Sequence, residues 1–370
     1  YAQFFCILKV AFLPREKHGK NKGAITMEKI KLGIIGVGNM GTCHIETILE
    51  GKTPEIEIAA AADRRESRRE WARSALGADV PVFEEGESLI ESGLCNAVLV
   101  AVPHYQHPEL SISALRHGLH VLCEKPAGVY TRQVREMNSA AEASDRVFAI
   151  MFNQRTNCVY RKMREMIACG AIGNIKRVNW IITNWYRSQS YYDSSSWRAT
   201  WKGEGGGVLV NQAPHQLDLL LWYMGDVDEV YGVWKNLNHP YIEVEDTAVA
   251  VVKFKSGAVG NIVVSNSQNP ALYGRAHIFG ENGAAAGVQT DGGAMFIAGM
   301  TSITEPPVND LWTVPGEEEM LPVWKKEDSD FFNSVDSMYY YHREQIKDFL
   351  EAVQSGKKPL VDATEGRRTV

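Results

Sequence analysis

The sequence lacks any pair of cysteines with a C-x-x-C spacing, and its six cysteines are scattered along the chain. This pattern argues against a zinc site or a disulfide framework and is typical of a reducing cytoplasm. Long basic runs are also missing from the body of the chain, and the formal net charge is −6. Nucleic acid is therefore not expected as a partner. We expect a cytoplasmic protein that holds no metal.

The first 26 residues differ in composition from the rest. Residues 1–13 are apolar except for Gln3 and Lys9, and residues 14–22 are basic. The apolar part is too short to span a bilayer, and it lacks the basic start and small-residue cleavage site of a signal peptide. We interpret 1–26 as upstream sequence outside the fold, with no membrane role. A membrane or targeting segment is the alternative.

A glycine-rich turn organises the N-terminal half. Gly36, Gly38 and Gly41 have the spacing G-x-G-x-x-G directly after an apolar run. The first glycine permits a tight turn, the second lets a pyrophosphate approach the backbone, and the third lets helix and strand pack closely. A second apolar run, 56–62, ends at Asp63, 22 residues past Gly41, where a ligand of the ribose 2′-hydroxyl is expected. We predict a dinucleotide site; an ordinary tight turn is the alternative.

The cofactor is expected to be NAD, with NADP second. Asp63 would repel a 2′-phosphate, whereas the neighbouring Arg64 would attract it. The backbone from the first to the last glycine should receive the pyrophosphate, because the helix that starts there directs its N–H groups at it. The residues assigned to this part of the cofactor site are Gly36, Val37, Gly38, Asn39, Met40, Gly41, Asp63 and Arg64.

A length of 370 residues suggests two domains. In the first, 27–152, near-continuous apolar runs alternate with helical patterns, which predicts a doubly wound parallel sheet of the Rossmann type. The expected strands are 31–35, 56–62, 97–102, 119–123 and 147–152, and the expected helices are 41–49, 66–76, 108–117 and 131–143.

In the second domain, 153–370, strand-like runs follow one another with turn signals between them. This order predicts an α+β domain with an open, mostly antiparallel sheet. Substrate is expected between the two domains, at the carboxyl ends of the parallel strands. The expected strands are 178–185, 227–235, 247–254, 258–265 and 276–279, and the expected helices are 159–169, 212–224 and 340–355.

Three polar constellations follow these elements. The stretch 103–107, with His104 and His107, comes after a buried strand, and Glu124-Lys125-Pro126 comes after the next one. A lysine there could favour an alkoxide; a surface pair with Glu124 is the alternative. Third, Asn211, His215 and Asp218 would share one face of a helix, where a polar stripe among leucines is costly without a purpose.

Together these stretches resemble the Gfo/Idh/MocA oxidoreductase family over about residues 29–365. The resemblance rests on the glycine motif and on the sequences PHYQH at 103–107, EKP at 124–126, GAIG at 170–173 and GGGVLVNQAPHQLD at 205–218. It implies NAD(P)-dependent oxidation or reduction of a hydroxyl on a sugar, inositol or related polyol. It also implies a sheet whose outer face commonly forms homodimers or homotetramers.

By the same resemblance, Lys125 is the catalytic lysine and His215 transfers the proton. The Lys125–Pro126 bond is expected to be cis. Many family members have Asp where this chain has Asn211, so His215 should hold its proton less tightly. Two other functions stay open: redox-neutral chemistry with retained NAD, and NAD binding without catalysis. The residues assigned to the nicotinamide edge are Pro103, His104, His107, Glu124 and Lys125.

The substrate is expected to be a pyranose or glycoside. Residues 188–202 are predicted to form a loop holding two Tyr, two Trp and Arg198, and loops seldom bury their aromatic side chains fully. Aromatic faces suit the apolar face of a sugar ring, and a guanidinium can donate to several hydroxyls. The residues assigned to the substrate are Arg155, Trp197, Arg198, Asn211 and Asp218.

Overall fold

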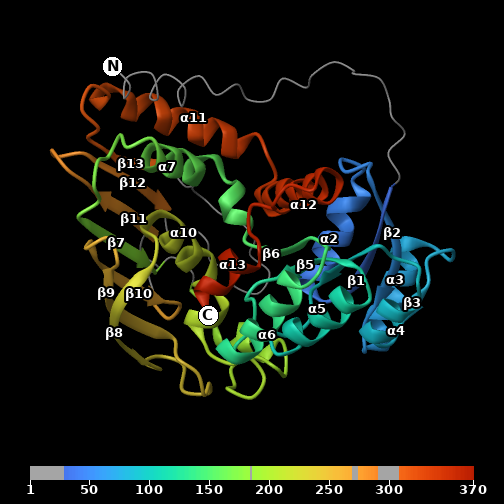
Figure 1. Ribbon diagram of the computed structural model, residues 1–370. Helices are drawn as coiled ribbons and strands as arrows, with labels where there is room; N and C mark the ends of the chain where they lie inside the picture. Colours follow the sequence, from blue (N-terminus) through green and yellow to red (C-terminus); the bar gives the residue numbers. More distant parts are fainter. Residues whose placement is uncertain (1–28, 184–185, 269–273, 291–307) are drawn as a thin grey trace, which may run out of the picture. The chain divides into compact units, whose positions relative to one another are not determined.

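The computed structural model describes residues 29–183, 186–268, 274–290 and 308–370 (Figure 1). The chain divides into two compact units. The first unit contains the described residues up to Asn153 together with 337–370, and the second contains those from Gln154 to Asp336.

The first unit is built on a six-stranded sheet with the order β3-β2-β1-β4-β5-β6. Every neighbouring pair in it is parallel, which confirms the predicted doubly wound fold. The strands are β1 (Ile30–Ile35), β2 (Ile56–Ala62), β3 (Val82–Phe83), β4 (Ala97–Val100), β5 (His120–Glu124) and β6 (Phe148–Met151). The short β3 was not predicted, because two residues carry no readable period.

Helices cover both faces of this sheet, so its strands are buried on both sides as their apolar runs require. Helices α2 and α12 pack together, and α5 packs on α6. The helices and turns are α2 (Asn39–Leu49), α3 (Glu66–Leu76), α4 (Gly86–Glu91), α5 (Gln106–Arg116), α6 (Thr131–Glu142), α12 (Ser337–Ser355), α13 (Ala363–Gly366) and η3 (Arg367–Thr369), and the turn η1 (Asn153–Thr156) begins at the last residue before the second unit.

The C-terminal segment differs from the expected division. Residues 337–370 were assigned to the second domain, but they pack with the first unit. Ile346 and Phe349 of α12 enter the core on one face of the parallel sheet, and the N–H of Ile150 donates to the carbonyl of Val361 at 3.1 Å. The apolar period of α12 predicts a helix, but it carries no information about which sheet the helix covers. The first boundary lies one residue from the expected one, between 153 and 154.

The second unit holds a seven-stranded sheet with the order β13-β12-β11-β7-β10-β9-β8. Only the β7–β10 pair is parallel among its described pairs, so the prediction of a mostly antiparallel sheet is confirmed. The strands are β7 (Arg177–Ile182), β8 (Val227–Lys235), β9 (Thr247–Phe254), β10 (Val259–Ser265), β11 (Gly274–Phe279), β12 (Ala285–Thr290) and β13 (Val308–Trp312).

One face of this sheet is covered by α7 and α10, whose apolar side chains share a core with Trp180 and Phe254 of the strands. Strand β7 ends at Ile182, and residues 184–185 of the expected strand lie outside the described ranges. The helices and turn of this unit are α7 (Cys158–Ala168), α8 (Gln189–Asp193), α9 (Val208–Asn211), α10 (Pro214–Met224), η2 (Glu318–Met320) and α11 (Leu321–Asn333).

The helix expected over 212–224 begins only at Pro214. Asn211 ends the short helix α9, and Gln212 and Ala213 form a turn before α10. Proline has no N–H to donate and clashes with the preceding helical turn, so it starts a new helix here. Asn211 and His215 therefore do not lie on one uninterrupted helix, and the expected shared face applies only to residues of α10.

Candidate active site

The glycine loop between β1 and α2 has room where a pyrophosphate would need it. A Cβ atom at Gly36 (φ 93°) would lie 2.4 Å from the carbonyl oxygen of Ala101, and one at Gly41 would lie 1.9 Å from that of Gly36. At Gly38 the nearest atom, on Arg65, would be 3.7 Å away. Gly38 is the N-cap of α2, and no side chain in the described ranges caps the helix there. The loop therefore fits the phosphates of a dinucleotide.

Asp63, which directly follows β2, is hydrogen-bonded to this loop. Its Oδ2 accepts the backbone N–H of Val37 at 2.8 Å, and its Oδ1 accepts the backbone N–H of Arg65 at 2.9 Å. The expected Arg64 instead donates to Glu85 at 2.8 Å, with its side chain largely exposed. Arg65 is the arginine beside Gly38. The sequence offered no signal for choosing between adjacent arginines, because their directions depend on the turn after β2.

Three loops leave the parallel sheet at one edge. Ile35 pairs with Val100, and Val100 pairs with Cys123, so the ends of β1, β4 and β5 are level. The glycine loop, the 101–105 segment and Lys125 therefore emerge side by side, at the carboxyl edge where such sheets bind ligands. Pro103 is exposed in this segment and His104 is buried.

His107 is buried, and its ring bridges the 101–105 segment and the segment that follows Lys125. Its Nδ1 lies 2.7 Å from the carbonyl oxygen of Pro126 and its Nε2 lies 2.8 Å from that of Val102. Burial lowers the pKa of His107, against the opposing effect of the two carbonyl hydrogen bonds. Because both ring nitrogens face backbone carbonyls, His107 supports the site and is not presented to a cofactor, contrary to the expected contact. The Lys125–Pro126 bond is cis, as predicted.

Glu124 is buried and both of its oxygens are engaged. Nε2 of His44 donates to Oε1 at 2.7 Å, and the backbone N–H of Lys125 donates to Oε2 at 3.1 Å. Burial raises the pKa of Glu124, but the hydrogen bond from His44 and the charges of His44, His342 and Lys125 outweigh it and hold the pKa at about 2. An exposed surface pair with Lys125 is not what the structure shows.

In the second unit, Asn211 donates a hydrogen bond to the buried carboxylate of Glu204. Glu204 also accepts the backbone N–H of Ala199 at 2.7 Å. His215 lies half-buried in the first turn of α10. Asn211 carries no charge itself, but its side-chain amide lies against the carboxylate of Glu204. Sequence reasoning missed Glu204, since it precedes the three glycines without any motif of its own.

Arg155 and Asp218, both assigned to the substrate, bind each other. Nε of Arg155 donates to Oδ2 of Asp218 and Nη2 donates to Oδ1, both at 2.7 Å. The two side chains are only 2% and 1% exposed. A two-point ion pair at this depth is part of the core of the second unit, so the expectation that these residues contact substrate is not supported.

The aromatic segment 186–204 contains the short helix α8 and is not purely a loop. Its Tyr192 is only 3% exposed, so the expectation of incompletely buried rings is wrong there. The guanidinium of Arg198 lies over the rings of Tyr191 and Trp197, at 4.4 and 4.7 Å from their centroids. Trp197 and Arg198 themselves are half-buried. The stacking holds them together at the surface of the segment.

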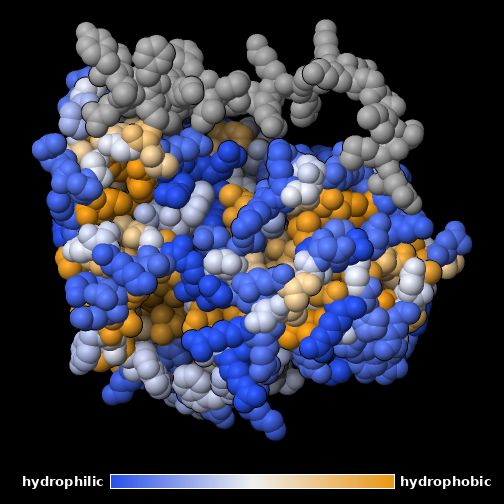
Figure 2. Space-filling view, viewed as in Figure 1, coloured by the Kyte–Doolittle hydropathy of each residue, from blue (hydrophilic) through white to orange (hydrophobic). Residues whose placement is uncertain are grey.

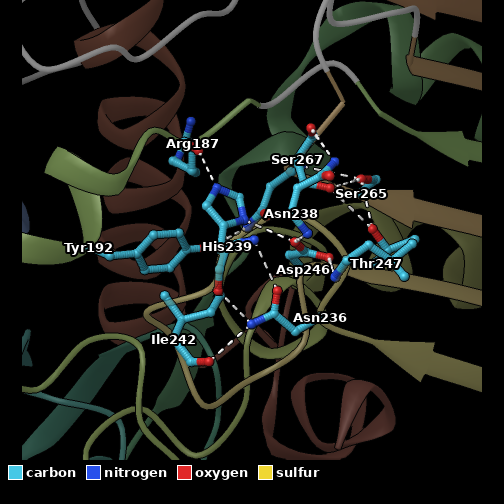
Figure 3. A network of polar contacts seen from close by, with 12 residues as sticks. Arg187, Tyr192, Asn236, Asn238, His239, Ile242, Asp246, Thr247, Ser265 and Ser267 are labelled. Atoms are coloured by element: carbon cyan, nitrogen blue, oxygen red, sulfur yellow. Dashed lines mark hydrogen bonds and ion pairs between the residues drawn. The ribbon is translucent and has the colours of Figure 1, made fainter.

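A buried network anchors this segment to the β8–β9 connection (Figure 3). His239 donates from Nδ1 to Asp246 at 3.0 Å and from Nε2 to the carbonyl of Arg187 at 2.7 Å. Burial lowers the pKa of His239, but the bonds to Asp246 and to Arg187 outweigh it, so the pKa is raised. Burial likewise raises the pKa of Asp246, yet its hydrogen bonds, led by that from His239, bring it to about 2. With one ring nitrogen on Asp246 and the other on the carbonyl of Arg187, His239 ties the two segments together.

A cavity of about 560 Å³ adjoins the network. Besides His239, its lining includes two tyrosine rings and three side-chain amides, a mixture that can stack on a ring and bond to hydroxyls. These five residues are Tyr186, Gln189, Asn238, Tyr241 and Gln268. Among the described residues, no group of three or more His, Cys, Asp or Glu side chains could hold a metal. No helix in the same ranges has the length and apolarity to span a bilayer.

The parallel sheet, its glycine loop and the acid after β2 define a dinucleotide-binding oxidoreductase. Residues 30–152 match the family described as "Oxidoreductase family, NAD-binding Rossmann fold", and residues 160–286 match the GFO/IDH/MocA C-terminal domain. The chain belongs to the Gfo/Idh/MocA family of NAD-binding oxidoreductases.

The relatives of this chain include dehydrogenases of inositol and of glucosides. The myo-inositol 2-dehydrogenase of Thermotoga maritima is 26% identical over 356 residues, which cover 91% of this chain and 92% of the relative. The D-glucoside 3-dehydrogenase of Escherichia coli is 26% identical over 206 residues, 55% of this chain and 56% of the relative. The WlbA dehydrogenase of Bordetella pertussis, crystallised with NADH and UDP-GlcNAcA, is 26% identical with a TM-score of 0.77, covering 92% and 93% of the two chains.

Proposed function

We propose that this enzyme is an NAD-dependent dehydrogenase of sugars, glycosides or cyclic polyols that acts on a secondary hydroxyl. The observation that carries the proposal is the placement of Lys125 at the carboxyl edge of the parallel sheet, level with the glycine loop. Relatives named as inositol and glucoside dehydrogenases support a polyol or sugar substrate.

Oxidation of a carbinol removes a hydride from carbon and a proton from oxygen. NAD, when bound, supplies the hydride acceptor. In the proposed mechanism an imidazole nitrogen of His215 accepts the hydroxyl proton. The ammonium of Lys125 donates a hydrogen bond to the oxygen as negative charge develops there. Asp63 and the glycine loop would hold the ribose and the pyrophosphate of NAD, at the same edge of the sheet as Lys125.

The aromatic segment supports a ring substrate. Trp197 and Arg198 form a stacked pair that is partly accessible, and the nearby cavity is lined mainly by tyrosine rings and side-chain amides. Such a surface binds a neutral, polyhydroxylated ring better than a small acyclic alcohol, which offers no flat apolar face. We therefore favour a pyranose or its glycoside.

The outer face of the second unit's sheet supports a homodimer or homotetramer. The face of the molecule in Figure 2 is mainly hydrophilic with apolar side chains between. Strands β8 and β9 carry large exposed apolar residues, including Tyr231 at 74% and Val251 at 58%. Exposed apolar patches of this kind mark interaction surfaces. The scattered cysteines, without any C-x-x-C pair, support a cytoplasmic location.

Purified protein tested with NAD against myo-inositol, methyl glucosides and linear polyols, with NADH absorbance as the signal, checks the function. Turnover should be greatest with a ring compound. Absence of NADH formation with every compound, despite NAD binding, contradicts the proposal. A best substrate that is linear contradicts the ring assignment alone.

A further inference from the structure

We propose that His44 and His342 are positioning residues that hold the Glu124 side chain in place and through it set the backbone of Lys125. Neither histidine belongs to a motif of the sequence. The inference rests on the proposed catalytic role of Lys125. All of the residues involved belong to the first unit, and they surround the buried carboxylate of Glu124.

The contacts form a chain that ends at the lysine. Glu124 stands at the end of β5 and is buried, with one oxygen on His44 at 2.7 Å and the other on the N–H of Lys125 at 3.1 Å. A carboxylate held at both oxygens cannot rotate without losing one of these bonds. Because His44 lies on α2, which begins in the glycine loop, the lysine is tied to the element that receives the cofactor.

His342 closes the cluster from the far end of the sequence. Its ring meets that of His44 edge to face at 5.5 Å between centroids. The side-chain nitrogen of Asn153 lies 3.2 Å from the His342 ring nitrogens. His44 is fully buried and His342 is 9% exposed. Helix α12 therefore contributes His342 to this cluster, in addition to covering the sheet.

The charges explain why the histidines are needed. Facing the carboxylate are His44 from α2, His342 from α12 and Lys125 from its own loop, while Asn153 is neutral. Burial by itself raises the pKa of Glu124, and the hydrogen bond from His44 is the largest effect opposing it. If that donor is removed, the pKa of Glu124 should rise, and a protonated carboxyl accepts the Lys125 N–H poorly.

The test uses full-length enzyme with NAD and its best sugar. His44→Phe removes the donor at similar volume, His44→Gln keeps a donor, and Thr47→Val is the matched control. Thr47 is equally buried on α2, but its hydroxyl donates to the carbonyl of Cys43 in the same helix. His342→Phe is measured in parallel, so that the inference can still be tested if one of the two variants does not fold.

We expect His44→Phe to lower kcat by about 10²-fold, the cost of a displaced catalytic group, with the Kd for NAD unchanged. The acid limb of its kcat/KM profile should move to higher pH, and His44→Gln should restore much of both. The protonated-carboxyl infrared band should appear at neutral pH in cofactor-free His44→Phe but not in Thr47→Val.

An acid limb and a carboxyl band that stay as in the wild type, in whichever of His44→Phe and His342→Phe folds, overturn the inference. So does a loss of kcat equal to that in Thr47→Val. The proposed function is tested separately by Lys125→Met. If that variant stays fully active, the catalytic role of the lysine is wrong. If it is inactive while His44→Phe behaves as wild type, only the positioning role fails.

Discussion

The carboxylate of Asp63 accepts the backbone N–H of Val37 at 2.8 Å, so the acid after β2 is bonded to the middle of the glycine loop. The same carboxylate holds the guanidinium of Arg65 at 3.3 Å. The acid expected to favour NAD and an arginine able to bind a 2′-phosphate thus lie beside the same loop, and they form an ion pair with each other.

This arrangement predicts that NAD is preferred at least several-fold over NADP in kcat/KM, because Asp63 repels a 2′-phosphate. Arg65→Ala should reduce the residual activity with NADP. Arg64→Ala is the matched control and should not, since that side chain pairs with Glu85. Equal or better kcat/KM with NADP in the wild type contradicts the prediction.

Lys125→Ala and His215→Ala should each lower kcat by about 10²–10⁴-fold, the usual contribution of a positioned acid–base group. The Kd for NAD, followed by fluorescence titration, should change little. Lys176→Ala, at an exposed pair with Glu281, serves as a control and should keep full activity. A wild-type kcat in His215→Ala would show that another group accepts the proton.

Asp218→Ala should destabilise the second unit by about 3–5 kcal/mol, because it leaves Arg155 buried without its partner. Chemical denaturation measures the loss, and replacing both residues by Leu and Met should recover part of it. Asp330→Ala, at an exposed pair with Lys326, should change stability little. Unchanged stability with a selectively raised sugar KM would restore the sequence-based substrate role of Asp218.

Trp197→Ala and Arg198→Ala should raise the KM for the sugar well above any change in the KM for NAD. Removing either partner takes away one side of the stacked pair and the ring face it offers. Val323→Ala is the comparison, since this exposed apolar residue lies on α11, outside the aromatic segment. Sugar KM values that match the wild type in both variants count against the aromatic segment as the sugar site.

His239 should make stability depend on pH. Its pKa in the folded protein is raised above the ordinary value of 6.5, so its contribution is complete below that value and is lost as pH rises through the folded pKa. Thermal unfolding of the wild type should show a decline in Tm on the alkaline side that His239→Gln lacks. His117→Gln, at the exposed end of α5, should retain it. An identical Tm–pH curve for His239→Gln and the wild type rejects the imidazolium.

The sequence alone determined the fold class and the cofactor class. Both rest on local information: glycines at fixed spacing shape a single turn, and apolar runs of strand length require a sheet covered on both faces. The level ends of β1, β4 and β5 then follow from parallel pairing. For this reason the fold class, the family and NAD could be predicted, and the comparisons confirm them.

Only the tertiary structure decided which polar groups meet. Arg155 and Asp218 are 63 residues apart, and His342 reaches His44 from the opposite end of the chain. No period or spacing encodes such pairs, because a buried charge takes whichever partner the packed elements bring within hydrogen-bond reach. The same packing turned Arg64 away from the glycine loop and placed α12 on the first unit. Sequence motifs specify backbone turns, whereas the packing of segments distant in sequence decides which side chains pair.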